Sequence, residues 1–218
     1  LAGQITDGES DVGAPDYDFR MLDVPEPAAD DVEIMDGFPE RVTGRLVFVP
    51  RENLNTDGIY GKEHTYRELT RPEMAEVVMA NYDPSFAGRT EAGDILVGTR
   101  NFGTGSSREQ AATALQAKGI RLVLAETLSQ TYQRNAFNNG FICIECPGLV
   151  RALEEQLAAE LESGAPTVIP GDDLTVDFRR GVAAWRGTEY RFPPLDRVPQ
   201  ALVVAGGVEA RVREKVGV

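Results

Sequence analysis

A short glycine-rich turn places two serines and an arginine in succession. Residues 103–108 read Gly-Thr-Gly-Ser-Ser-Arg, and a helix is predicted from Ser107 onward. Serine hydroxyls can donate and accept protons, the guanidinium of Arg108 can bind a carboxylate through two hydrogen bonds, and a helix N-terminus favours anions. The pattern predicts a site that holds an acid and removes a proton from it. The simpler alternative is a turn in which a serine only caps the helix.

The same turn differs from two common phosphate-binding motifs. It lacks the Gly-Lys-Ser/Thr ending of a phosphate loop. Arg108 also stands where a dinucleotide fingerprint has its third glycine. Neither nucleotide-binding motif is therefore present in these residues.

A second polar loop lies about fifty residues upstream. Residues 53–57 read Asn-Leu-Asn-Thr-Asp, and residues 60–66 read Tyr-Gly-Lys-Glu-His-Thr-Tyr. On composition alone this is a turn-rich loop, because Asn, Asp and Gly favour turns.

Cys143 and Cys146 have the spacing of some metal and redox sites. They fall on a predicted buried strand, where residues three apart point to opposite faces. The chain has no other cysteine, and His64 is its only histidine. We therefore interpret both cysteines as core residues and expect no metal to be held by this chain.

Strands and helices alternate along the chain, which predicts an α/β domain with a central, mostly parallel sheet flanked by helices. Strands are expected at residues 41–49, 94–98, 120–125 and 141–145, and helices at 71–80, 107–118, 128–138 and 148–160. Short strands follow over 165–192, and a helix broken near Gly206 follows over 198–214. This order places the Ser-Ser-Arg turn at the carboxyl end of a strand, where open α/β sheets bind ligands.

Charge is concentrated at the N-terminus of the 218-residue chain. Residues 1–36 hold eleven acids and one base, a charge of −10, so residues 37–218 carry −3 of the total of −13. We interpret residues 1–33 as an acidic arm or linker and residues 34–218 as one domain. The chain has no basic stripe, no long apolar run and no visible signal peptide, so we expect neither a nucleic-acid nor a membrane partner.

Three separated segments, taken together, resemble the mobile swivel domain of the aconitase superfamily. They are the turn at residues 103–109, the Asn-x-x-Thr-Asp sequence at 53–57, and residues 134–141 (Arg-Asn-Ala-Phe-Asn-Asn-Gly-Phe). The resemblance implies that Ser106 is the catalytic base and that Asp57 helps shape the active site. It further implies a substrate-binding set in which Arg108 holds a carboxylate: Thr104, Gly105, Ser107, Arg108, Tyr60, Lys62, His64, Thr65 and Tyr66.

The resemblance also implies a reaction and a partner. Aconitase-type enzymes are hydro-lyases that isomerise hydroxy-polycarboxylates through dehydration and rehydration, with a [4Fe-4S] cluster held by three cysteines. This chain cannot supply three, so we expect the cluster on a partner, an iron–sulfur large subunit of the same enzyme, or on a missing N-terminal region. The chain itself would be the small subunit.

The loop at residues 60–66 is most similar to that of homoaconitases, since Lys62 beside tyrosines suits an additional carboxylate. We therefore expect conversion of homocitrate or homoaconitate to homoisocitrate, a step of lysine biosynthesis. Two alternatives are the small subunit of 3-isopropylmalate dehydratase, in leucine biosynthesis, and a non-catalytic carboxylate-binding module. A cytoplasmic location is the default expectation, with the mitochondrial matrix as the alternative.

Overall fold

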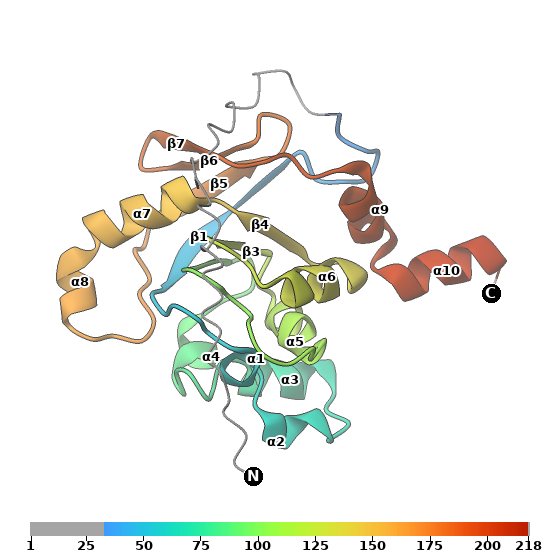
Figure 1. The fold of residues 1–218 in the computed structure, drawn as a ribbon, viewed down its shortest axis with the longest axis horizontal. Coiled ribbons are helices and arrows are strands. Elements are labelled where there is room, and N and C mark those ends of the chain that lie inside the picture. Colours follow the sequence, from blue (N-terminus) through green and yellow to red (C-terminus); the bar gives the residue numbers. More distant parts are fainter. Residues whose placement is uncertain (1–32, 218) are drawn as a thin grey trace, which may run out of the picture.

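Seven strands form one mixed sheet in the computed structural model, which describes residues 33–217 (Figure 1). The strands are β1 (Arg41–Val49), β2 (Ile95–Gly98), β3 (Leu122–Ala125), β4 (Ile142–Glu145), β5 (Asp173–Asp177), β6 (Val182–Trp185) and β7 (Thr188–Arg191). Their order is β4-β3-β2-β1-β5-β6-β7. Neighbours from β1 to β4 are parallel, whereas β5 to β7 continue the sheet antiparallel. The predicted α/β fold is confirmed, with four of seven strands in the parallel part.

Ten helices complete the described part of the chain. They are α1 (Thr56–Ile59), α2 (Lys62–Thr65), α3 (Arg71–Val77), α4 (Phe86–Arg89), α5 (Gln110–Lys118), α6 (Gln130–Asn138), α7 (Pro147–Gln156), α8 (Ala158–Glu162), α9 (Arg197–Ala205) and α10 (Val208–Val216). The acidic arm predicted over residues 1–33 lies, apart from Glu33, outside the described residues.

Two hydrophobic clusters lie on the two faces of the sheet. Alternate residues of β1 show the division, because Val47 and Val49 belong to one cluster and Leu46 and Phe48 to the other. Such alternation is what the two-residue period of a strand requires. Helices α5 and α6 cover the first face, whereas α7 and side chains of β5 and β6 fill the second. With both faces covered, the three short parallel strands β2, β3 and β4 are almost fully apolar.

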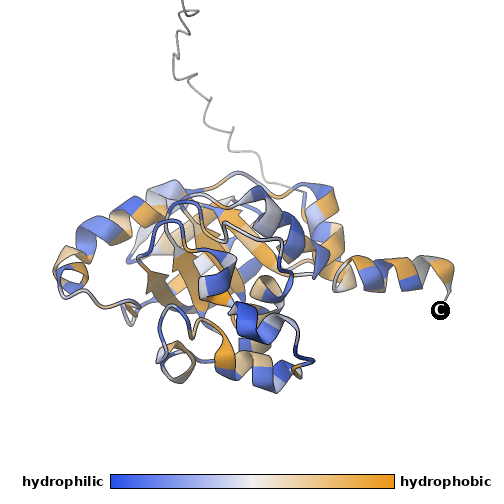
Figure 2. Cartoon of the chain, turned by 60° about the horizontal axis from the view of Figure 1, so that its bottom comes forward, coloured by the Kyte–Doolittle hydropathy of each residue, from blue (hydrophilic) through white to orange (hydrophobic). Residues whose placement is uncertain are grey.

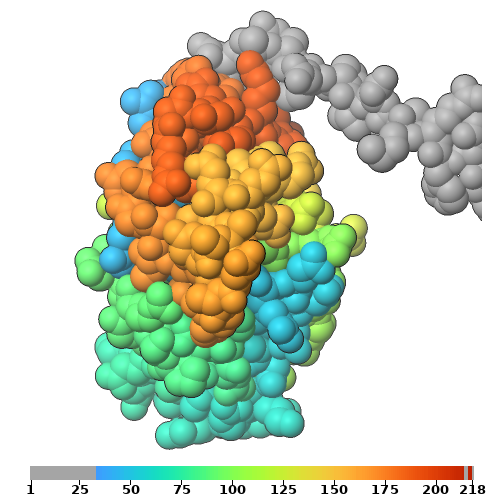
Figure 3. Space-filling view, turned by 90° about the vertical axis from the view of Figure 1, so that its left-hand side faces the viewer, coloured from blue at the N-terminus to red at the C-terminus, as the bar shows by residue number. Residues whose placement is uncertain are grey.

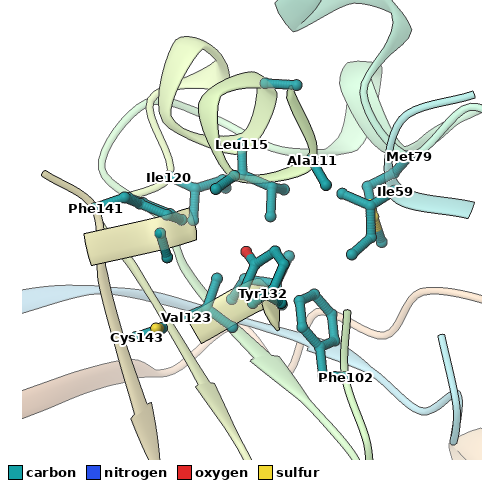
Figure 4. Close-up of a cluster of buried hydrophobic side chains, with 14 of the residues drawn as sticks. Ile59, Met79, Phe102, Ala111, Leu115, Ile120, Val123, Tyr132, Phe141 and Cys143 are labelled. Atoms are coloured by element: carbon teal, nitrogen blue, oxygen red, sulfur yellow. The ribbon is translucent and has the colours of Figure 1, made fainter. Parts of the chain in front are cut away.

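Tyr132 of α6 lies in the middle of the first cluster, next to the residue that precedes the glycine-rich turn. Figure 4 shows it beside Phe102, with Leu115 and Ala111 of α5 above the two rings. The rings of Tyr132 and Phe102 meet edge to face with centroids 5.3 Å apart. Both side chains are buried. The turn that follows Phe102 therefore starts from a rigid base.

The last helix differs in its surroundings. After Gly206 ends α9 with a left-handed φ of 77°, α10 projects from the body (Figure 2). Val208, Val212 and Val216 are exposed along it. Within residues 33–217, no helix is long and apolar enough to cross a membrane.

Candidate active site

The functional loops lie at the carboxyl ends of neighbouring parallel strands. β1 ends at Val49 and β2 at Gly98, and these two residues are paired in the sheet. The loop after β1 carries the Asn-x-x-Thr-Asp sequence, and the loop after β2 carries the Ser-Ser-Arg turn. Two motifs about fifty residues apart in sequence therefore start side by side at the edge where open α/β sheets place their ligands.

Backbone hydrogen bonds join the two loops along their length. These bonds run from Asn53 N to Arg100 O (2.9 Å), from Gly103 N to Leu54 O (2.8 Å) and from Thr56 N to Thr104 O (2.8 Å). We call this set the loop ladder. Because main-chain bonds do not depend on side-chain rotamers, the ladder fixes the two motifs relative to each other.

Gly103 lets the turn pass close to α6. Its φ of 74° is left-handed, and a Cβ added there would lie 2.3 Å from Cγ of Tyr132. Glycine alone combines this conformation with this approach. Gly105 is also left-handed, with φ of 96°, but an added Cβ would come no nearer than 3.5 Å to Asn55. Gly103 is thus required for packing as well as for the turn.

Ser106 is exposed at the surface, and its hydroxyl contacts a buried side chain. Its Oγ lies 2.9 Å from Oγ1 of Thr56. Thr56, which is 2% exposed, can also donate to the backbone oxygen of Ser106 at 3.2 Å. The candidate base is therefore exposed to a ligand on one side and bonded to a buried hydroxyl on the other.

Arg108 and Asp57 form an ion pair across the two loops. Nη1 of Arg108 donates to Oδ1 of Asp57 at 2.9 Å and to the backbone oxygen of Tyr60 at 3.0 Å. Asp57 also accepts from the backbone N–H of Lys62 at 2.8 Å. The bond from Arg108, assisted by that from Lys62, lowers the pKa of Asp57, which is ionised at neutral pH. Asp57 thus holds the guanidinium of Arg108 in one orientation.

The arginine keeps donors for a ligand. Among residues 33–217, neither Nε nor Nη2 of Arg108 has a hydrogen-bond partner. Its side chain is 17% exposed. The paired Nη1 fixes the guanidinium, and the remaining edge matches the fork geometry of a carboxylate.

The predicted start of the helix after this turn is wrong. α5 begins at Gln110 with Glu109 as N-cap, not at Ser107. The left-handed Gly105 leads the chain away, and Asn135 of α6 donates to the backbone oxygen of Ser107 at 3.1 Å, so Ser106 and Ser107 precede the helix. Ser106 therefore does not lie in the first turn of a helix, as the sequence had suggested.

The segment at residues 60–66 divides into a buried and an exposed part. Tyr60 is 1% exposed and belongs to the first hydrophobic cluster, so it is a core residue, and its place in the substrate-binding set stays a prediction. Burial raises its pKa. Lys62 and Tyr66 are exposed on either end of α2. These two are the predicted loop residues that a ligand can reach most directly.

His64 and Thr65 are partly buried in α2. Nε2 of His64 lies 3.7 Å from Oε1 of Glu63, and its ring packs 5.7 Å from that of Tyr60. Within residues 33–217, Nδ1 of His64 and Oγ1 of Thr65 have no hydrogen-bond partner. The structure brings neither residue to Ser106 through a hydrogen bond among these residues, so their role in binding stays a prediction.

A cleft of about 690 Å³ borders the site on the β1 side. It lies between the loop after β1, coloured blue, and the yellow-to-orange segment of α7 and α8 (Figure 3). Its polar lining includes Arg51, Asn53, Asn55, Asp57 and Glu154. Ser106 and Arg108 do not line it. Asp57 therefore stands between the cleft and the open surface that carries the serine.

The two cysteines do not fit an iron–sulfur cluster. Both are free and buried, and they belong to the clusters on opposite faces of the sheet. Burial raises the pKa of both thiols, that of Cys146 to about 11. Among residues 33–217, no three His, Cys, Asp or Glu side chains come together to hold a metal ion. Their interpretation as core residues is confirmed.

Two residues near the serines were not assigned to the site from sequence. Thr56 was noted only as part of its motif, and Asn135 only as part of a helix end. The structure places Thr56 against Ser106 and Asn135 against Ser107. Buried polar side chains are normally hydrogen-bonded. Their burial is the property that would have indicated these two residues, and the sequence alone does not show it.

Comparison with known proteins adds family information. A family model described as the aconitase C-terminal domain matches residues 24–148. Mitochondrial homoaconitase of Chaetomium globosum is 42% identical over an alignment of 192 residues that covers 85% of this chain and 24% of that protein. Mitochondrial homoaconitase of Candida glabrata is 51% identical over 134 residues, 61% of this chain and 19% of that protein. The chain thus spans about a quarter of the length of the first of these curated relatives.

A solved structure is similar over most of the fold. It is that of 3-isopropylmalate dehydratase from Methanocaldococcus jannaschii, with a TM-score of 0.67 and 25% identity. The match covers 81% of this chain and 95% of the other.

Proposed function

The chain belongs to the aconitase C-terminal domain family, and we propose that it supplies the base and the carboxylate-binding arginine of a hydro-lyase. One observation carries the proposal. The loop ladder fixes an exposed serine, Ser106, and the Asp57–Arg108 ion pair on the same two neighbouring loops. Homoaconitase and 3-isopropylmalate dehydratase, the named relatives, are hydro-lyases. This chain would contribute the groups that handle the proton.

The proposed reaction removes and restores water on a hydroxy-polycarboxylate. A proton next to a carboxylate is weakly acidic, so its removal needs a strong base and a fixed positive charge at the carboxylate. Arg108 binds that carboxylate through its free edge. The deprotonated Oγ of Ser106 takes the proton, the electrons of the broken C–H bond form a C=C bond, and the neighbouring hydroxyl leaves. Hydration is the reverse with the hydroxyl added at the other carbon.

The aconitase family uses an iron–sulfur cluster, and the described residues do not fit one. We propose that the cluster belongs to a cluster-bearing large subunit, or to another region of a longer chain. The open surface at Ser106 and the cleft beside Asp57 support a site that is completed by such a second component.

The substrate that we propose is homocitrate or homoaconitate. The exposed Lys62 supports a substrate with an additional carboxylate, and the curated relatives are named homoaconitases. 3-Isopropylmalate is the second candidate. It is favoured by the solved 3-isopropylmalate dehydratase structure, 95% of whose chain is matched by this one. The relatives' names also carry the word mitochondrial, which favours the mitochondrial matrix over the cytoplasm as the proposed location.

The test is anaerobic turnover of this chain combined with the cluster-bearing component from the same source. Homoaconitate, 3-isopropylmalate and citrate are assayed in parallel. We expect hydration of homoaconitate only in the mixture, and a loss of orders of magnitude in kcat for Ser106→Ala. Thr188→Ala, an exposed hydroxyl on β7, is the matched control and should keep full activity. Carboxylate binding without turnover, despite an intact cluster and a formed complex, would favour the non-catalytic module instead.

A further inference from the structure

The hydroxyl of Thr56 has two possible acceptors, and both belong to Ser106. Its Oγ1 lies 2.9 Å from Oγ of Ser106 and 3.2 Å from the backbone oxygen of the same residue. The side chain is buried at 2% exposure. Within residues 33–217, no other group is hydrogen-bonded to this hydroxyl. Thr56 therefore acts on the serine alone.

A threonine hydroxyl carries one hydrogen, so the protonation state of Ser106 decides where it points. While Ser106 is protonated, its Oγ can donate to Oγ1 of Thr56, and Thr56 can donate to the backbone oxygen. Once Ser106 has lost its proton, its Oγ can only accept, and a rotation of the Thr56 hydroxyl supplies a donor. A hydrogen bond to an ionised oxygen is stronger than one between neutral groups.

The backbone holds Thr56 in place for this exchange. Its N–H donates to Thr104 O at 2.8 Å as part of the loop ladder, and its carbonyl accepts from the N–H of Tyr60 at 2.9 Å. Asn55 caps the same turn by accepting from Gly58 N at 2.8 Å. The donor is thus already oriented before a substrate binds, and little side-chain freedom is lost.

We propose that Thr56 is a positioning residue that holds Ser106 and stabilises its deprotonated form. This inference rests on the proposed function, in which Ser106 is the base. When Oγ of Ser106 takes the substrate proton, the new O–H donates a hydrogen bond to Oγ1 of Thr56. The Thr56 hydroxyl then rotates back and donates its hydrogen bond to the backbone oxygen of Ser106. Asp57 and Arg108, the charged pair of the same two loops, keep their protonation states throughout.

The experiment compares Thr56→Val, Thr56→Ser, Ser106→Ala and the wild type, each combined with the cluster-bearing component and assayed on the substrate that the wild type turns over. Valine keeps the shape of threonine and removes the donor, so kcat should fall by about tenfold to a hundredfold while KM changes by less than about threefold. Thr56→Ser restores the donor and should recover most of the rate.

A deuterium isotope effect separates this role from a structural one. With substrate deuterated at the carbon that loses its proton, the effect on kcat should rise in Thr56→Val, because proton removal becomes slower than the other steps. It should stay near the wild-type value in Thr56→Ser. If Thr56→Val folds poorly, the same comparison is made with Thr56→Ala, with thermal unfolding reporting the folded fraction.

The outcomes also separate the two proposals. Wild-type kcat in Thr56→Val, or a lower kcat with an unchanged isotope effect, overturns the role of Thr56 while an inactive Ser106→Ala leaves the proposed function standing. An inactive wild type, or an active Ser106→Ala, overturns the proposed function and the role of Thr56 with it.

Discussion

Replacing Gly103 with alanine tests whether the close approach of the turn to α6 sets the geometry of the site. The new Cβ would lie 2.3 Å from Cγ and 2.6 Å from Cβ of Tyr132. Tyr132 cannot yield easily, since it is 1% exposed and packs against Phe102. Overpacking of this kind costs about 1–3 kcal/mol. The left-handed φ of 74° adds about 1–2 kcal/mol for a residue with a Cβ.

The expected loss in the free energy of unfolding is therefore about 2–5 kcal/mol, a fall in Tm on the order of 10 °C for a domain of this size. Urea and thermal unfolding measure it. Gly105→Ala is the matched control, because it has the same kind of φ and nothing closer than 3.5 Å, and it should lose only about 1–2 kcal/mol. If both variants unfold at the same urea concentration, the contact with Tyr132 does not constrain the turn, and the reasoning fails.

Three further predictions concern other parts of the chain. Arg108→Gln should raise the pKa of Asp57 toward its ordinary value of about 3.9, which NMR titration can follow. In the wild type this pKa is lowered, so the stabilisation by the ion pair is present above a pH of about 4 and is lost as the pH falls through the lowered pKa. Cys143 and Cys146 should resist alkylation at pH 8 in the native protein and react rapidly in guanidinium, and fast native labelling would contradict their burial. Thr70→Ala should cost about 1 kcal/mol in urea unfolding, because Thr70 caps α3; an unchanged midpoint would count against the cap.

The parallel part of the fold was predictable because its signals are local. The run Leu-Val-Leu-Ala of β3 is apolar on both faces, and Gly119 ends α5 with a left-handed φ of 91°. A buried strand and a glycine stop each leave a mark within a few residues. The helices α1 and α2 leave no such mark, since four residues are too few for a hydrophobic period.

The contacts within the site were not predictable in the same way. The family resemblance named Ser106, Asp57 and Arg108, but the partner of Arg108 is 51 positions away and no local pattern encodes that pairing. The burial of Tyr60 likewise follows from how α1 and the residue after it pack on the core, although the loop around them is rich in polar residues. The delayed start of α5 depends on Asn135 from another helix. Tertiary contacts decided each of these features.

The loop ladder divides the active face into two parts that can change separately. The ladder and its side chains, from Asn53 to Asp57 and from Arg100 to Arg108, hold every group assigned to proton transfer. α2 lies outside it and is joined to it by the bond from Lys62 N to Asp57. The backbone N–H of Lys62 makes that contact, so the contact survives any side chain at position 62 except proline. The side chains from Lys62 to Tyr66 can therefore change without breaking the backbone bonds that fix Ser106, Asp57 and Arg108 relative to one another.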